Sequence, residues 1–70
     1  MSDVAEKIIN FLREKKRGTI KEIVEGVGSS YTYVYLEIMF KLIPKGIVDR
    51  KWENGKFVYF LNEGELNDNS

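Results

Sequence analysis

The sequence has no cysteine and no histidine among its 70 residues, and a single proline. Without cysteine the chain forms no disulfide and carries no thiolate nucleophile, and the common zinc sites need cysteine or histidine ligands. Histidine is also the most frequent general acid or base of enzymes, and no glycine-rich phosphate loop is present. We therefore expect a protein that is not an enzyme, with no catalytic residues, no metal and no cofactor.

Long apolar runs are also missing. No stretch approaches the roughly 20 apolar residues of a membrane-spanning helix, and the N-terminus lacks the basic start and apolar run of a signal peptide. These features predict an intracellular, cytoplasmic protein without a membrane partner. Glutamine is absent as well, while lysine, glutamate and isoleucine are frequent, which is typical of proteins from hot environments.

The net charge of zero divides unevenly along the chain. Residues 1–62 carry 11 basic and 8 acidic side chains, a net charge of +3, while residues 63–70 carry three acidic ones. We predict one folded domain over residues 1–62 and an acidic, disordered tail over residues 63–70. The mildly basic body is compatible with nucleic-acid binding, and equally with a solvated surface of mixed charge.

Two helices are predicted before residue 29. Ser2 or Asp3 can cap the first helix, Gly18 is its expected stop, and its apolar positions recur at helical spacing. These positions are Val4, Ala5, Ile8, Ile9, Phe11 and Leu12. Thr19 and Glu22 form a capping box that starts a second, short helix, which ends at a glycine turn over residues 26–28. Its inward side chains are expected to be Ile20, Ile23, Val24 and Val27.

A third helix is predicted between Ser29 and Gly46, and it is apolar on nearly every side. The two serines at its start can cap it, and Pro44 and Gly46 end it. We assign to the core the side that carries Tyr31, Tyr35, Ile38, Met39 and Leu42. The opposite side carries Tyr33, Leu36 and Phe40. A helix that is apolar all round is either buried or covered by a partner.

The C-terminal part of the domain predicts a β-hairpin. Two extended segments, residues 47–53 and 56–61, flank Asn54-Gly55, the strongest short-range signal for a two-residue type I′ turn. That turn sets the register of the two strands. The expected pairs are Glu53 with Lys56, Trp52 with Phe57, Arg50 with Tyr59, and Val48 with Leu61.

This order of elements resembles a winged helix-turn-helix domain. From Gly18 to Leu61 the chain is similar to small transcription regulators of that family from archaea, archaeal viruses and bacteria. The resemblance includes the segment Lys45 to Val48, which follows the third helix, and the strand end Tyr59-Phe60-Leu61. It implies an α+β fold in which three helices are followed by a two-stranded β-hairpin, the wing.

In DNA-binding members of the family the third helix enters the major groove and the wing lies on the backbone. The resemblance thus implies sequence-specific or general binding of double-stranded DNA, as a transcriptional regulator and a homodimer. The residues implied as DNA contacts are Ser29, Ser30, Thr32, Tyr33, Leu36, Glu37, Lys41, Lys51, Asn54, Gly55 and Lys56. The basic residues that support this hypothesis are Lys21, Lys41, Arg50, Lys51 and Lys56.

Winged-helix domains also serve as protein-interaction modules, and this alternative stays open. Large apolar side chains on the outer side of the third helix and on the wing are of the types that anchor protein interfaces. The candidate interface consists of Tyr33, Leu36, Phe40 and Trp52. We expect Tyr31, Tyr35 and Phe57 to pack in the core instead, because small cores are often built from aromatic residues.

Overall fold

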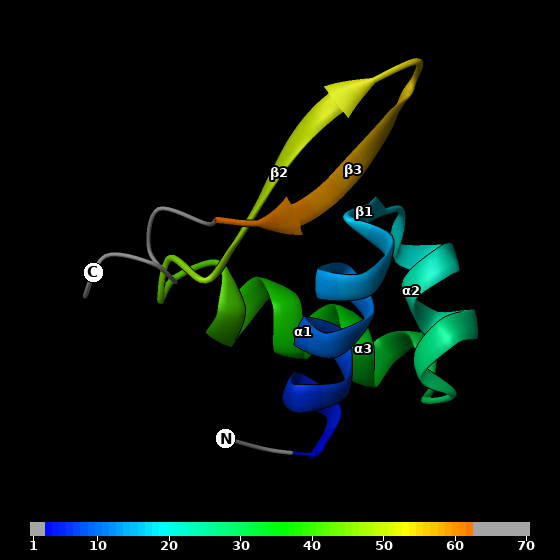
Figure 1. The fold of residues 1–70 in the computed structure, drawn as a ribbon, viewed down its shortest axis with the longest axis vertical. Coiled ribbons are helices and arrows are strands. Elements are labelled where there is room, and N and C mark those ends of the chain that lie inside the picture. Colours follow the sequence, from blue (N-terminus) through cyan, green and yellow to red (C-terminus); the bar gives the residue numbers. More distant parts are fainter. Residues whose placement is uncertain (1–2, 63–70) are drawn as a thin grey trace.

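The computed structural model describes residues 3–62, which form a small α+β fold. The elements, in chain order, are α1 (Asp3–Lys15), β1 (Arg17–Gly18), α2 (Ile20–Val27), α3 (Tyr31–Glu37), η1 (Ile38–Leu42), β2 (Val48–Glu53) and β3 (Lys56–Leu61). The helices gather into one body, and the β2–β3 hairpin stands out from it (Figure 1). The expected tail over residues 63–70 and the candidate cap Ser2 lie outside the described residues.

None of the helices within residues 3–62 has the length and apolar character needed to cross a membrane.

Both helices predicted before residue 29 form, but α1 ends at Lys15, before a positive φ of 79° at Lys16, and the expected stop Gly18 lies in β1. The apolar side of α1 is buried, with Phe11 only partly so. At the start of α2 the Thr19 hydroxyl accepts a hydrogen bond from the Glu22 amide at 3.2 Å, and the Glu22 carboxylate accepts one from the Thr19 amide at 2.9 Å. This reciprocal pair satisfies amides that have no partner within the helix. Gly28 ends the helix in the left-handed region, at φ 80°, where a side chain would be strained.

The third helix begins at a serine, as expected, but its second half is wider than an α-helix. The Ser30 hydroxyl caps α3 by accepting a hydrogen bond from the Tyr33 amide at 3.2 Å. From Ile38 the chain continues as the π-helix η1, and the Ile43 amide donates to the Ile38 carbonyl at 2.9 Å. Gly46, at φ 79°, then turns the chain into the sheet.

The predicted core side of the third helix is confirmed for Ile38 and Leu42, with Met39 partly buried against the core, but not for the first turns of the helix. Val34, Ile38 and Leu42 are buried, whereas Tyr31 and Tyr35 are 56% and 40% exposed. The assignment of these two tyrosines to the core is therefore wrong. A branched aliphatic side chain fills a small interior without a polar atom, while a buried tyrosine hydroxyl needs a hydrogen-bond partner. With Val34 turned inward, the roughly 100° turn per residue carries Tyr35 to the side of the helix.

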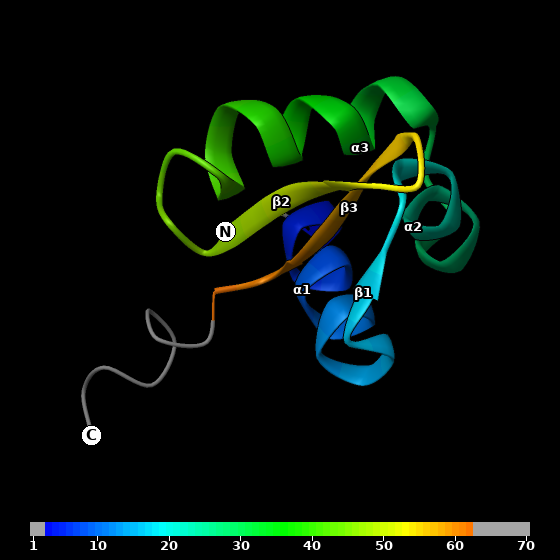
Figure 2. The same ribbon diagram turned by 90° about the horizontal axis from the view of Figure 1, so that it is seen from above.

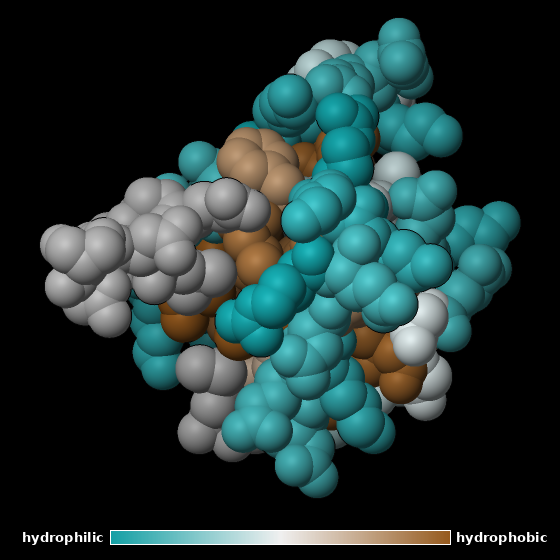
Figure 3. Space-filling model, in the orientation of Figure 1, coloured by the Kyte–Doolittle hydropathy of each residue, from teal (hydrophilic) through white to brown (hydrophobic). Residues whose placement is uncertain are grey.

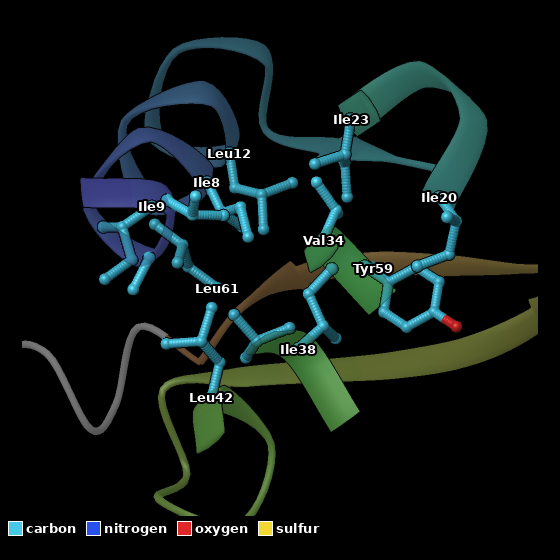
Figure 4. Packing of buried hydrophobic residues seen from close by; sticks show 13 residues of the cluster. Ile8, Ile9, Leu12, Ile20, Ile23, Val34, Ile38, Leu42, Tyr59 and Leu61 are labelled. Carbon is cyan, nitrogen blue, oxygen red and sulfur yellow. The ribbon is translucent and has the colours of Figure 1, made fainter. Parts of the chain in front are cut away.

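The core is mainly aliphatic. Its side chains come from α1, α2, α3, η1, β2 and β3 and converge on one interior (Figure 4). Ile8, Ile23 and Ile38 are fully buried there. Tyr59, 3% exposed, is the one aromatic residue among the buried hydrophobic side chains of residues 3–62.

The sheet has three antiparallel strands in the order β1-β3-β2, not the predicted two. The hairpin itself has the expected register in all four pairs, and Asn54 and Gly55 take positive φ values of 52° and 81°. The additional strand pairs Arg17 with Phe60 and Gly18 with Tyr59. Two residues are too few to show an alternating pattern, so the sequence indicated only a helix stop at this place. The whole arrangement is compatible with a winged-helix-like fold.

Candidate nucleic-acid interface

A groove of about 400 Å³ lies between the helices and the hairpin. It is bounded by the first turn of α2, one side of α3 and one face of β2 and β3. Seen from above, α3 runs alongside the hairpin, and α1 and β1 lie on the opposite side from α3 (Figure 2). The exposed side chains that line the groove are Lys21, Tyr31, Tyr35, Arg50, Lys56 and Phe57.

The charged side chains that line the groove are all cationic. Lys21, Arg50 and Lys56 contribute three positive charges, and no carboxylate is among the described residues of its lining. Across residues 3–62 the ion pairs are Arg17–Glu53, Lys41–Glu37 and Lys51–Glu53, so the three groove cations have no carboxylate partner there. Uncompensated positive charge in a concave surface attracts anions.

Aromatic rings form the other part of the lining. Tyr31 and Tyr35, one helical turn apart, have nearly parallel rings with centroids 6.3 Å apart. On the hairpin, Phe57 meets Trp52 edge to face at 4.9 Å, because the register places these two residues opposite each other. The guanidinium of Arg50 lies 4.0 Å from the centre of the Phe57 ring, a cation–π contact that orients this cation.

The predicted contacts at the start of α3 are mostly accessible. Ser30, Thr32, Tyr33 and Leu36 are exposed, and Ser29 is half-buried. Glu37, in contrast, is only 4% exposed. It lies on the side of the helix turned towards the body, where it forms an ion pair with Lys41 at 3.2 Å. The expectation that Glu37 belongs to the outer, base-reading surface is therefore wrong.

The predicted basic contacts separate into two groups. Lys41 is held by Glu37 and Lys51 by Glu53, at 3.2 and 3.1 Å. Lys51 also lies 5.8 Å from the centre of the Phe60 ring, and together with Lys16 and Arg17 it borders a different pocket. Asn54, Gly55 and Lys56 are exposed at the hairpin tip, and of these Lys56 reaches the groove.

Three of the groove residues are ones that the sequence predicts in the core: Tyr31, Tyr35 and Phe57. The hairpin register already placed Phe57 on the same face as Arg50 and Trp52, a mixture of cation and aromatic rings that favours a binding surface over a core. For the two tyrosines the spacing of four residues indicated a shared side of the helix but not which way that side faces.

The candidate protein interface lies outside the groove. Tyr33, Leu36 and Phe40 are exposed on α3 and η1, and Phe40 is the most exposed of them at 70%. Trp52 is also exposed, but its ring contacts Phe57 on the hairpin. The face of the molecule drawn in Figure 3 is mostly hydrophilic, with hydrophobic patches between the polar side chains.

The hairpin is fastened to the body by a cluster of charges. Arg17 of β1 donates a hydrogen bond to Glu53 near the end of β2, and Lys51 forms an ion pair with the same carboxylate. The hydrogen bond from Arg17, followed by that from Lys51, lowers the pKa of Glu53 below its ordinary value of 4.5. The link spans 36 residues of sequence and joins β1 to the tip of the hairpin.

No model of a known protein family matches this chain, and no curated protein sequence does either. The arrangement of its own side chains is therefore the basis for proposing a function.

Proposed function

We propose that this protein is a winged-helix protein that binds double-stranded DNA. The helix α3 would enter the major groove, and the hairpin would lie along the sugar-phosphate backbone. One observation carries the proposal: the exposed start of α3 and the hairpin flank a groove whose charged lining is entirely cationic. Phosphate contacts supply most of the affinity of such proteins, so the unpaired cations are the decisive feature.

The side chains at the start of α3 suit this contact. Ser30, Thr32 and Tyr33 are exposed there, and hydroxyl groups can bond to phosphate oxygens and to base edges. Leu36, one turn further along, can contact the methyl group of thymine. Lys21, Arg50 and Lys56 would hold phosphates beside the helix, which would position the helix without reading the base sequence.

The proposal implies a modest affinity for each molecule. Three phosphate contacts give a slope of about −3 in a plot of the logarithm of the binding constant against the logarithm of the salt concentration. A homodimer would double the contacts and would recognise two half-sites related by a two-fold axis. Such a dimer is the usual form of a transcriptional regulator, and we propose this role for the protein.

Fluorescence anisotropy of a labelled random duplex, titrated with protein at several salt concentrations, tests the proposal. We expect the salt slope of about −3, and we expect Lys56→Ala to reduce its magnitude by about 1. Lys7→Ala is the matched control, because Lys7 is exposed on α1, and α1 contributes no residue to the groove lining. The absence of duplex binding at low salt, or equal effects of the two substitutions, would contradict the proposal.

The exposure of Tyr33, Leu36 and Phe40 favours a second candidate function, a protein-interaction module. Three large apolar side chains on one side of a helix are the kind of surface that a partner protein or a second copy of this chain covers. Failure of duplex binding in the anisotropy experiment would make this candidate the preferred one.

A further inference from the structure

The groove contains more aromatic surface than contact with a duplex requires. In double-stranded DNA the flat faces of the bases are covered by their neighbours, so a protein meets only phosphates, sugars and base edges. Phosphates need the cations of the groove, whereas the rings of Tyr31, Tyr35 and Phe57 have no flat surface of the duplex to contact. Unpaired bases, in contrast, stack readily on aromatic side chains.

We infer that the groove binds single-stranded DNA, with a base stacked on the tyrosines of α3 and the adjoining phosphates on Lys21, Arg50 and Lys56. The inference concerns the same groove as the proposed function, but it needs no duplex contact and can be tested separately. It assigns to this surface a second class of nucleic acid, one whose bases are unpaired.

The tyrosine pair has the geometry of a stacking platform. The rings of Tyr31 and Tyr35 are inclined by only 8° to each other, so they present surfaces of nearly the same orientation. Both side chains are substantially exposed, and both line the groove. Tyrosine has only two side-chain torsions to order, so it offers a large contact surface at a small entropic cost.

The cations are placed for a strand rather than for an isolated anion. Lys21 comes from α2, Arg50 from β2 and Lys56 from β3, so the positive charge extends over three elements around the rings. A single strand offers successive phosphates to such an arrangement. Arg50 is already oriented by Phe57 at 4.0 Å, which reduces the side-chain entropy lost on binding.

The volume of the groove agrees with this occupant. At about 400 Å³ it falls within the range of about 300–1,000 Å³ typical of small-molecule sites, which is enough for a base and its sugar. An acidic peptide would also be attracted by the three cations. It would leave the parallel tyrosine rings without a planar partner, however, so the single strand uses both properties of the groove.

Anisotropy of a labelled oligothymidine of about 15 nucleotides tests the inference, because such a strand has no pairing partner and is long enough for one binding site. We expect Tyr35→Ala to weaken its binding by about 5- to 150-fold, the usual range for the loss of one base–aromatic stack. We expect Tyr35→Phe to bind like the unmodified protein. The matched control is Phe40→Ala, which removes an exposed aromatic ring from η1, outside the groove and outside the proposed DNA contacts.

A second readout comes from the chain itself. Trp52 is the only tryptophan of the sequence and contacts Phe57 at the edge of the groove. Its fluorescence should therefore change when the oligothymidine binds, with the same dissociation constant as the anisotropy. Lys21→Glu, which reverses a charge at an exposed position, should weaken binding without altering the far-ultraviolet circular dichroism of the protein.

The outcomes separate this inference from the proposed function. Binding of the single strand that depends on Tyr35 supports the inference whether or not a duplex binds. Binding of the duplex without binding of the oligothymidine overturns the inference and leaves the proposed function intact. Equal losses from Phe40→Ala and Tyr35→Ala also overturn it, because an aromatic ring outside the groove would then matter as much as one inside it.

Discussion

Glu37 is the residue whose environment is least expected for its type. Its side chain is 5% exposed, and one carboxylate oxygen forms an ion pair with Lys41, whose side chain is 56% exposed. The other oxygen, Oε1, is buried and has no hydrogen-bond partner among the described residues. Burying a carboxylate carries a desolvation penalty. When one oxygen has no hydrogen bond and the cationic partner is half exposed, this penalty exceeds the stabilisation that the ion pair gives.

The first prediction follows from this imbalance. Glu37→Met keeps the length of the side chain, is a good helix former and removes the unsatisfied oxygen, so we expect it to raise the free energy of unfolding by about 1 kcal/mol. Lys41→Met leaves the buried carboxylate without its cation, and we expect a loss of about 1 kcal/mol or more. Urea denaturation of both variants measures these changes. If Glu37→Met instead lowered the free energy of unfolding, both oxygens of the Glu37 carboxylate would have hydrogen-bond partners in solution.

At the scale of helices and strands, the features that the sequence predicted correctly are those that depend on local patterns. The capping box at Thr19 and Glu22 set the start of α2, and Asn54-Gly55 set the register of the hairpin, because each depends on a few neighbouring residues. The strand at Arg17–Gly18 had no such signal. Its pairing with β3 depends on residues more than 40 positions away, which no local pattern indicates.

The site was harder to predict than the fold, for a reason that lies in α3. A helix with apolar residues nearly all round leaves its rotation undetermined, so Tyr31 and Tyr35 were assigned to the interior and Glu37 to the surface. The structure reverses both. Which side of α3 turns inward depends on the shape of the space between α1, α2 and the sheet. That space is filled by Val34 and Ile38. The DNA contacts themselves stay a prediction.

The packing of α1 on α2 supplies a second stability test. Gly26 lies inside α2 rather than in the expected turn, and a Cβ atom there would lie 2.2 Å from Cε2 of Phe11 and 2.4 Å from its Cδ2. We expect Gly26→Ala to lower the free energy of unfolding by about 1–2 kcal/mol, since crowding of the ring outweighs the gain of roughly 1 kcal/mol in helix propensity.

A double-mutant cycle distinguishes crowding from a general effect on the helix. In a Phe11→Leu background the ring is absent, so Gly26→Ala should become neutral or stabilising when measured by the same urea denaturation. An equal loss in both backgrounds would contradict the proposed contact between Phe11 and Gly26.

At the scale of the whole molecule, the hairpin and the helical body are joined along β3. One edge of β3 pairs with β2 and the other with β1, which directly follows α1. The hydrogen bond from Arg17 to Glu53 extends this joint beyond the two residues of β1. Because the groove lies between the hairpin and α3, its width depends on how firmly this joint holds the hairpin.

The stability that the pairing of Arg17 with Glu53 contributes should be lost in acid. The pKa of Glu53 is lower in the folded protein than its ordinary value of 4.5, mainly because of the hydrogen bond from Arg17. A group whose folded pKa is depressed contributes stability above its unfolded pKa and loses that contribution as the pH falls through the folded value. We therefore expect the unmodified protein to be more stable than Glu53→Gln above pH 4.5, with the difference vanishing below the lowered pKa.

Thermal unfolding of both proteins between neutral pH and about pH 2 measures that difference. The other carboxylates of the chain titrate in both proteins, so subtracting the variant isolates the contribution of Glu53. A difference that stays constant throughout the acid range would show that the Glu53 carboxylate is not held by Arg17. Arg17→Met should reduce the same pH dependence, because it removes the main cause of the lowered pKa while leaving Lys51 in place. If Arg17→Met left the pH dependence of stability unchanged, Lys51 would be the main cause of the lowered pKa. The ion pair between Arg17 and Glu53 would then not hold the hairpin to β1.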